Sequence, residues 1–338
     1  MPGRTSESGF NTLELIISAT VTMAVLGAAL AGFMGMSQSA DGAQLISGIN
    51  LNLRSSLNVL TRDLLAAGRD IPVGGIPVPS GVNAAALARP APEGAGLTFA
   101  AGDTTLDAVT PGQALGVEIA GVATDMITIL MSDPTLVLSD EFLAGIAADG
   151  SSATVDAATP IDDAAVGITA GDLILFSNSL GNAIQMVTGV NGQVMQFGNG
   201  DDMNLNQRGA GQGTIIQIQS APDVYPPTTA TRVLMVSYYI DAADPARPAL
   251  VRRENFGDER VMAVGIDNIQ FTYDLVDGIT DPVNLPEPVL PNTPDQIRKA
   301  TIYIAGRSHR AWTRTAQILR LGLSTQVSLR SLSFRDRY

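Results

Sequence analysis

Few side chains in this chain of 338 residues could perform catalysis. There is no cysteine, the single histidine is His309, and the single lysine is Lys299. A Ser-His-Asp triad would need His309, and a Ser-Lys dyad would need Lys299. Ser308 cannot face the His309 ring productively from the adjacent position. Disulfides are excluded, a Cys/His zinc site is disfavoured, and no Gly-rich phosphate loop is followed by a lysine. We therefore expect no enzymatic activity.

One polar segment, "DDMNLNQRGAGQG" (201–213), has the residue types of a cation site. Asp202, Asn204 and Asn206 stand at alternate positions, as in the first half of a calcium loop. However, Gln207 occupies the place of the sharp-turn glycine, and no glutamate closes the loop. The pattern favours a plain polar loop, with a calcium site as the alternative and no other cofactor expected.

Basic residues are concentrated near the C-terminus of an otherwise acidic chain with a net charge of −13. Residues 298–338 contain 9 bases and 1 acid, whereas residues 70–297 contain 28 acids and 7 bases. In "RSHRAWTR" (307–314), arginines alternate with His309 and Trp312, a combination that can grip single-stranded nucleic acid. The acidic bulk argues against nucleic-acid binding. We expect an exposed loop between two strands, with a protein-binding segment as the alternative.

An isolated acid, Glu14, lies near the start of a long apolar run. It is the only charged residue from Phe10 to Met36. About 20 apolar residues suffice to cross a bilayer, and a charge at mid-membrane costs about 2.5–3.5 kcal/mol. A secretory signal cleaved at "ALAG" (29–32) or a plain single-pass anchor would explain the apolar run, but neither explains the acid.

Beyond the apolar run, a helical pattern continues over residues 37–68. Its apolar positions recur every three or four residues: Leu45, Ile49, Leu53, Leu57, Leu60 and Leu64. Gly68 supplies a C-terminal cap. The pattern predicts one helix from Phe10 to about Ala67, roughly 87 Å long, with residues 10–36 in a membrane and one face of residues 37–68 on a soluble domain.

The remaining sequence predicts a β-rich head over residues 97–338, reached through a Pro/Gly-rich linker at residues 69–96. Apolar–polar alternation predicts antiparallel strands, giving an α+β fold. Residues 278–296, with five prolines, predict an exposed excursion between strands. The predicted strands are 115–119, 125–131, 172–177, 183–188, 214–219, 232–240, 269–275, 300–306 and 324–333.

Three features at the N-terminus together resemble the processing site of type IV prepilins and pseudopilins. In "GFNTLELI", Gly9 matches the last leader residue, Phe10 the first mature residue and Glu14 the fifth. Further along, "AGDLILFSNSLGNAIQMVT", "RVMAVGIDNIQFTYDLVDG" and "LSTQVSLRSL" resemble segments of PilW-like minor pilins. Residues 97–170 contain no recognised motif.

This resemblance implies a pilin-like function without chemistry. A prepilin peptidase would remove leader residues 1–9 and methylate the amine of Phe10. The helix would anchor the subunit in the inner membrane, with membrane lipid around it and the head in the periplasm. An assembly platform would then move it into a fibre with other minor and major pilins, where the tip is its expected position.

In such a fibre Glu14 would pair with the N-terminal amine of a neighbouring subunit, which the helix dipole and a desolvated bundle both favour. Related pseudopilins also bind calcium. The alternatives are a minor pseudopilin of a type II secretion system, or a membrane-anchored or secreted β-rich binding protein outside any fibre.

Overall fold

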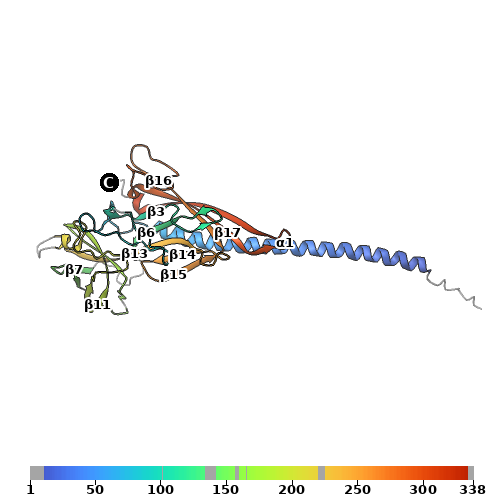
Figure 1. The fold of residues 1–338 in the computed structure, drawn as a ribbon, viewed down its shortest axis with the longest axis horizontal. Coiled ribbons are helices and arrows are strands. Elements are labelled where there is room, and N and C mark those ends of the chain that lie inside the picture. The colour runs from blue at the N-terminus through green and yellow to red at the C-terminus, as the bar shows by residue number, and fades with distance from the viewer. Residues whose placement is uncertain are drawn as a thin grey trace, which may run out of the picture.

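The computed structural model describes residues 11–100, 102–133, 142–156, 160–164, 166–219 and 225–333. A single long helix, α1 (Thr12–Ala66), is followed by a large antiparallel β-domain, which confirms the predicted α+β fold. Half of α1 projects from the head as a bare rod, and its other half lies along the strands (Figure 1).

Residues at each end of α1 explain where the helix begins and ends. The side chain of Asn11 accepts a hydrogen bond from the backbone N–H of Leu13 at the N-terminus. At the other end, Gly68 adopts φ +74°, and its N–H donates to the carbonyl of Leu130 at 2.9 Å. The predicted glycine cap is confirmed, and it also connects the end of the helix to a strand of the head.

Strands from distant parts of the chain form two principal sheets. The larger has the order β10-β9-β13-β7-β8-β12-β11, with β6 and β14 also paired to β13, β3 to β6 and β15 to β14. The second has the order β16-β17-β18, and two small pairs are β1-β2 and β4-β5. All these pairings are antiparallel.

The bounds of the strands are as follows: β1 (Ile76–Pro77), β2 (Thr105–Leu106), β3 (Val109–Gly112), β4 (Glu118–Ile119), β5 (Val122–Ala123), β6 (Met126–Ser132), β7 (Phe142–Ile146), β8 (Ser152–Asp156), β9 (Leu173–Asn178), β10 (Gly181–Met186), β11 (Gly189–Asn191), β12 (Val194–Gln196), β13 (Thr229–Asp241), β14 (Ala249–Glu254), β15 (Glu259–Val264), β16 (Ile266–Leu275), β17 (Ile297–Trp312) and β18 (Gln317–Ser328). Three short helices complete the described elements: η1 (Ile215–Ile218), η2 (Pro294–Gln296) and α2 (Arg330–Ser333).

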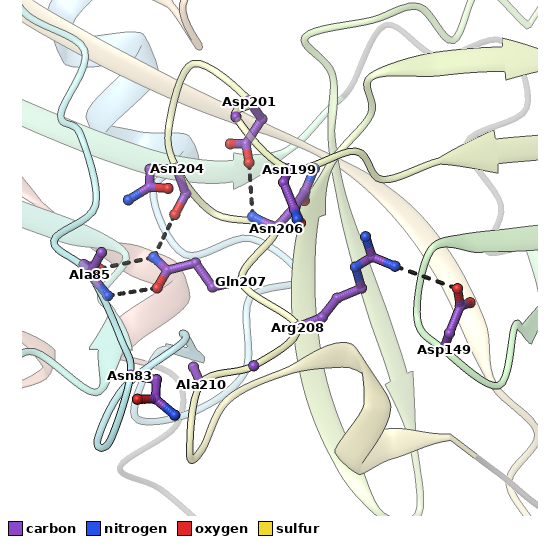
Figure 2. A pocket seen from close by; sticks show the side chains of 12 residues that line it. Asn83, Ala85, Asp149, Asn199, Asp201, Asn204, Asn206, Gln207, Arg208 and Ala210 are labelled. Carbon is purple, nitrogen blue, oxygen red and sulfur yellow. Dashed lines mark hydrogen bonds and ion pairs between the residues drawn. The ribbon is translucent and has the colours of Figure 1, made fainter.

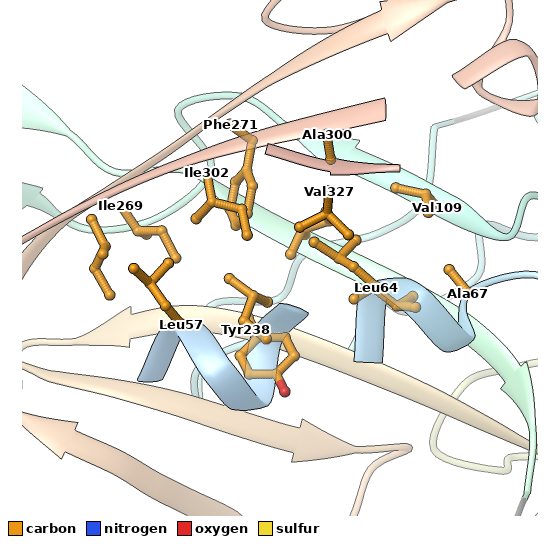
Figure 3. Packing of buried hydrophobic residues seen from close by; sticks show 14 of the residues in the cluster. Leu57, Leu64, Ala67, Val109, Tyr238, Ile269, Phe271, Ala300, Ile302 and Val327 are labelled. Atoms are coloured by element: carbon orange, nitrogen blue, oxygen red, sulfur yellow. The ribbon is translucent and has the colours of Figure 1, made fainter. Parts of the chain in front are cut away.

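The predicted apolar face of α1 is confirmed, because all six of its members are at most 9% exposed. Five of them, from Ile49 to Leu64, pack into one core with side chains from both principal sheets. Figure 3 shows Leu57 and Leu64 of α1 beside Phe271 of β16, Ile302 of β17 and Val327 of β18. The C-terminal half of α1 is therefore a core element of the head.

Several predictions of secondary structure were wrong. Within the predicted strand 214–219, residues 215–218 form η1, and the side-chain amide of Gln217 bonds back to the Gly213 N–H and the Gly211 carbonyl. Residues 307–312, predicted as loop, extend β17 because they pair with β18. The last predicted strand stops at Ser328, and α2 follows.

The segment 69–96 contains little regular structure, as expected, yet it is part of the head and not a spacer. Its apolar side chains Ile71, Ile76, Val78 and Leu87 are buried among residues of β9, β10 and β13. Arg89, 4% exposed, fixes the segment further, since its guanidinium donates to two carbonyls of β3 and to a hydroxyl of β6. Apolar residues between the prolines make this attachment.

The head also contains a carboxyl group in an unfavourable position, Asp107, between β2 and β3. Burial, with the nearby charges of Asp295 and Asp103, raises the pKa of Asp107 to about 7. The folded-state pKa therefore exceeds the unfolded value of 3.8. Folding favours the protonated form, so stability is lost as the pH rises from about 4 through 7.

We predict that Asp107→Asn raises the melting temperature at pH 8 by roughly 2–5 °C and changes it much less at pH 4. Asp258→Asn, at an exposed acid, removes the same charge and serves as the control. Thermal denaturation at both pH values measures the effect. Equal shifts for the two variants at pH 8 would contradict the assignment.

Candidate assembly interface

The N-terminal half of α1 is apolar, and from Leu13 to Met36 none of its side chains is buried. Its most hydrophobic 18-residue window has a mean hydropathy of 2.0 and is 0% buried. In length and composition it could cross a membrane, so the helix is compatible with a single-pass anchor. The large apolar side chains exposed along it are Leu13, Leu15, Ile16, Ile17, Val21, Met23, Val25, Leu26, Leu30, Phe33, Met34 and Met36.

Three hydroxyl groups in this half donate hydrogen bonds to carbonyls of the helix itself. Ser18 donates to the Leu15 carbonyl at 3.1 Å, Thr20 to the Ile16 carbonyl at 2.9 Å, and Thr22 to the Ser18 carbonyl at 2.7 Å. These bonds remove most of the cost of placing a hydroxyl among apolar groups. Such side chains therefore allow lipid or other helices to cover the rod.

Glu14 is the one charged residue in this half of the helix. It lies exposed in the first turn of α1, where the helix dipole favours an anion. Among the described residues, its carboxylate has no hydrogen-bond or ion-pair partner. An apolar environment would therefore require a cation from outside this part of the chain. Gly9 and Phe10, the predicted processing site, lie outside the described residues.

The helix leaves the head at a set of contacts that we call the Trp312 clamp: Trp312, Arg310 and Thr313 of the β17–β18 hairpin with Gln38, Asp41 and Gly42 of α1. The indole N–H of Trp312 donates to the Gln38 carbonyl at 2.8 Å. The Asp41 carboxylate pairs with Arg310 and accepts from the Thr313 hydroxyl. Gly42 gives the ring its space, because a Cβ there would lie 2.8 Å from the indole.

Further along the helix, a buried polar network fixes its rotation. Asp63, 5% exposed, accepts hydrogen bonds from the Tyr238 hydroxyl and from Arg252 Nε, each at 2.7 Å. Arg252 also pairs with Glu254. Burial and the adjacent Asp63 raise the pKa of Tyr238, so its hydroxyl stays a donor. These directional bonds allow one orientation of α1 on the sheet.

The three calcium candidates do not form one site. The amide of Asn206 is buried and binds the backbone N–H and C=O of Met186 and the carbonyl of Gly198. Asn204 donates to the Ala86 carbonyl. Asp201, not Asp202, accepts from the loop's backbone N–H groups (Figure 2).

Asp202 is exposed, and it is not among the residues lining the pocket of about 620 Å³ beside Asn204 and Asn206. Within the described ranges, no three His, Cys, Asp or Glu side chains are grouped to hold a metal ion. Through Asn206, the polar pattern attaches the loop to Met186 of β10.

The residues considered for catalysis or nucleic-acid binding are dispersed. His309 is exposed on β17, while the Ser308 hydroxyl donates to the Arg310 carbonyl and accepts from the Leu319 N–H. Lys299 lies 3.8 Å from Asp274, far along the same strand. The Trp312 ring packs on α1. Of these side chains, Ser308 stabilises the hairpin and Trp312 the clamp.

The comparisons with known proteins assign no family. No protein-family model, no curated protein and no solved structure matches the chain. The feature of the molecule that bears on function is therefore α1. Sequence analysis missed Gly42, although it lies three residues before Leu45 on the same helical face; its contact with Trp312 joins residues 270 positions apart.

The clamp predicts opposite effects for two glycine substitutions in α1. Gly48 is exposed, and a Cβ added to it would have no atom within 4 Å, so Gly48→Ala should stabilise the helix by roughly 1 kcal/mol. Gly42→Ala should instead destabilise by about 1–3 kcal/mol, because the methyl group displaces the indole. Denaturation monitored by Trp312 fluorescence measures both. The same sign for both variants would show that the clamp does not limit residue 42.

The buried network predicts a graded series. Asp63→Ala should cost about 3–5 kcal/mol, because Arg252 loses its deepest partner. Tyr238→Phe removes one hydrogen bond and should cost about 1 kcal/mol. Arg54→Ala, at an exposed arginine of α1 outside this network, is the control and should change little. A cost for Asp63→Ala no larger than that of the control would refute the role of the network.

Proposed function

We propose that this protein is a PilW-like minor pilin that helps to initiate assembly of a type IV pilus. One observation carries the proposal: α1 is continuous, its C-terminal half belongs to the core of the head, and its N-terminal half is apolar and uncovered. Such a helix needs lipid before assembly and other helices afterwards. The work of the protein is then helix packing and lateral contact.

The position of Glu14 supports a fibre subunit over a plain anchor. An anchor gains nothing from an exposed carboxylate in its apolar segment. In a bundle of parallel helices, the amine of a neighbour processed after Gly9 is a cation of the required kind. Pairing inside an apolar bundle would offset the desolvation of both charges and would set the register of the incoming subunit.

The shape of the head supports a position at the tip. Figure 1 shows β7 and β11 at the end of the molecule opposite the N-terminus of α1, beyond the other end of the helix. In a fibre of parallel helices this end faces outward, where a further subunit would otherwise stack. A minor pseudopilin of a type II secretion system uses the same physical design and is the second candidate, because nothing in α1 separates the two machines.

We predict that Glu14→Ala leaves membrane insertion unchanged but lowers the amount of the protein in fibres by at least about tenfold, equivalent to about 1.4 kcal/mol. Extraction of membranes and immunoblots of sheared fibres measure the two steps separately. Ser18→Ala is the matched control, because its hydroxyl bonds only within the helix. Normal incorporation of the Glu14 variant would refute the proposed pairing.

A further inference from the structure

The Trp312 clamp holds the tip of the β17–β18 hairpin at one level along α1. From Leu13 to Met36 the helix rises about 35 Å at 1.5 Å per residue. The hydrocarbon core of a bilayer is about 30 Å thick. If this segment spans the membrane, as the proposed function requires, then Gln38 lies among the lipid headgroups. The bond from Trp312 to Gln38 places the hairpin tip there too.

The arginines near the tip of this hairpin differ in their interaction partners. Arg310 pairs with Asp41, Arg320 with Asp267 at 3.1 Å, and Arg307 donates to the Pro245 carbonyl. Arg314 is exposed, and among the described residues no acid pairs with it. Its guanidinium stacks on the Trp312 ring, 5.8 Å from the ring centroid. Arg314 thus presents a cation without a carboxylate partner.

Arg314 also faces the membrane-spanning helix. A notch of about 580 Å³ lies between it and α1, lined by Gly32, Gly35, Met36, Gln38, Ser39 and Arg314. The two glycines have open space on their exposed sides. The α1 wall of the notch thus combines two glycines and Met36 with the polar Gln38 and Ser39, and the other wall is a guanidinium. An acyl chain and a phosphate group have the matching chemistry.

We propose that this notch binds the headgroup of an anionic phospholipid, with Arg314 on the phosphate and Trp312 at the interface. Tryptophan is enriched at membrane interfaces. An anionic lipid surface attracts a nearby basic residue such as Arg314. The net charge of −13 makes this local contact important, since the acidic head as a whole would be repelled by such a surface. The contact would orient the head on the membrane before assembly.

Trp312 is the only tryptophan of the chain, so its fluorescence reports directly on the notch. The full chain is reconstituted in phosphatidylcholine vesicles that contain brominated phosphatidylglycerol or, at the same mole fraction, brominated phosphatidylcholine. Quenching by the two lipids gives their relative affinity near the ring. We expect phosphatidylglycerol to bind about fivefold more strongly than phosphatidylcholine. High salt should reduce this difference, because it screens the charge of Arg314.

Arg314→Gln should reduce the ratio of the affinities for phosphatidylglycerol and phosphatidylcholine to nearly one. Arg247→Gln, at another exposed arginine, should leave this ratio unchanged. Equal quenching by both lipids in the wild type, or an unchanged preference in Arg314→Gln, would overturn the lipid site alone. No quenching by either lipid would overturn the membrane-spanning premise as well. Incorporation into fibres is measured separately and tests the proposed function independently.

Discussion

The apolar surface of α1 has to be covered along the whole helix, but the head covers only the C-terminal half. From Ile49 to Leu64 the helix contributes to the core that the two principal sheets share. From Leu13 to Met36 no side chain is buried. Since burial of apolar surface is the main driving force for association, the N-terminal half of α1 requires lipid or other helices to cover it. The same helix thus serves folding in one half and, in the other, is compatible with a single-pass anchor and with the proposed assembly.

The division between the halves is sharp because polar contacts define it. The network around Asp63 fixes the rotation of α1, and the Trp312 clamp fixes the level at which the helix leaves the head. Because the 55-residue helix is continuous, both constraints extend to Glu14. The head and the proposed pairing site therefore keep a fixed relation, which a subunit that joins a fibre in register needs.

Local patterns predicted the parts of the fold that local physics decides. The length of α1, its buried face, the cap at Gly68 and strands β6, β9, β10, β13 and β16 all follow from periodicity and turn residues. Errors occurred where distant contacts decide the outcome. Pairing with β18 extends β17 past His309. The segment around Ile76 packs into the core of the head. Of the candidate site, Glu14 could be predicted from its isolation, while the fit of Trp312 on Gly42 required the folded chain.

In the proposed function, α1 enters a fibre after removal of a leader, which frees an amine that pairs with the Glu14 carboxylate of a neighbouring subunit. Mass spectrometry of the N-terminal peptide, on protein recovered from membranes of the native host, tests it most directly. The account predicts a chain that starts at Phe10 with a methylated amine. A chain that starts at Gly32, or one that retains residues 1–9 while it functions, would contradict it.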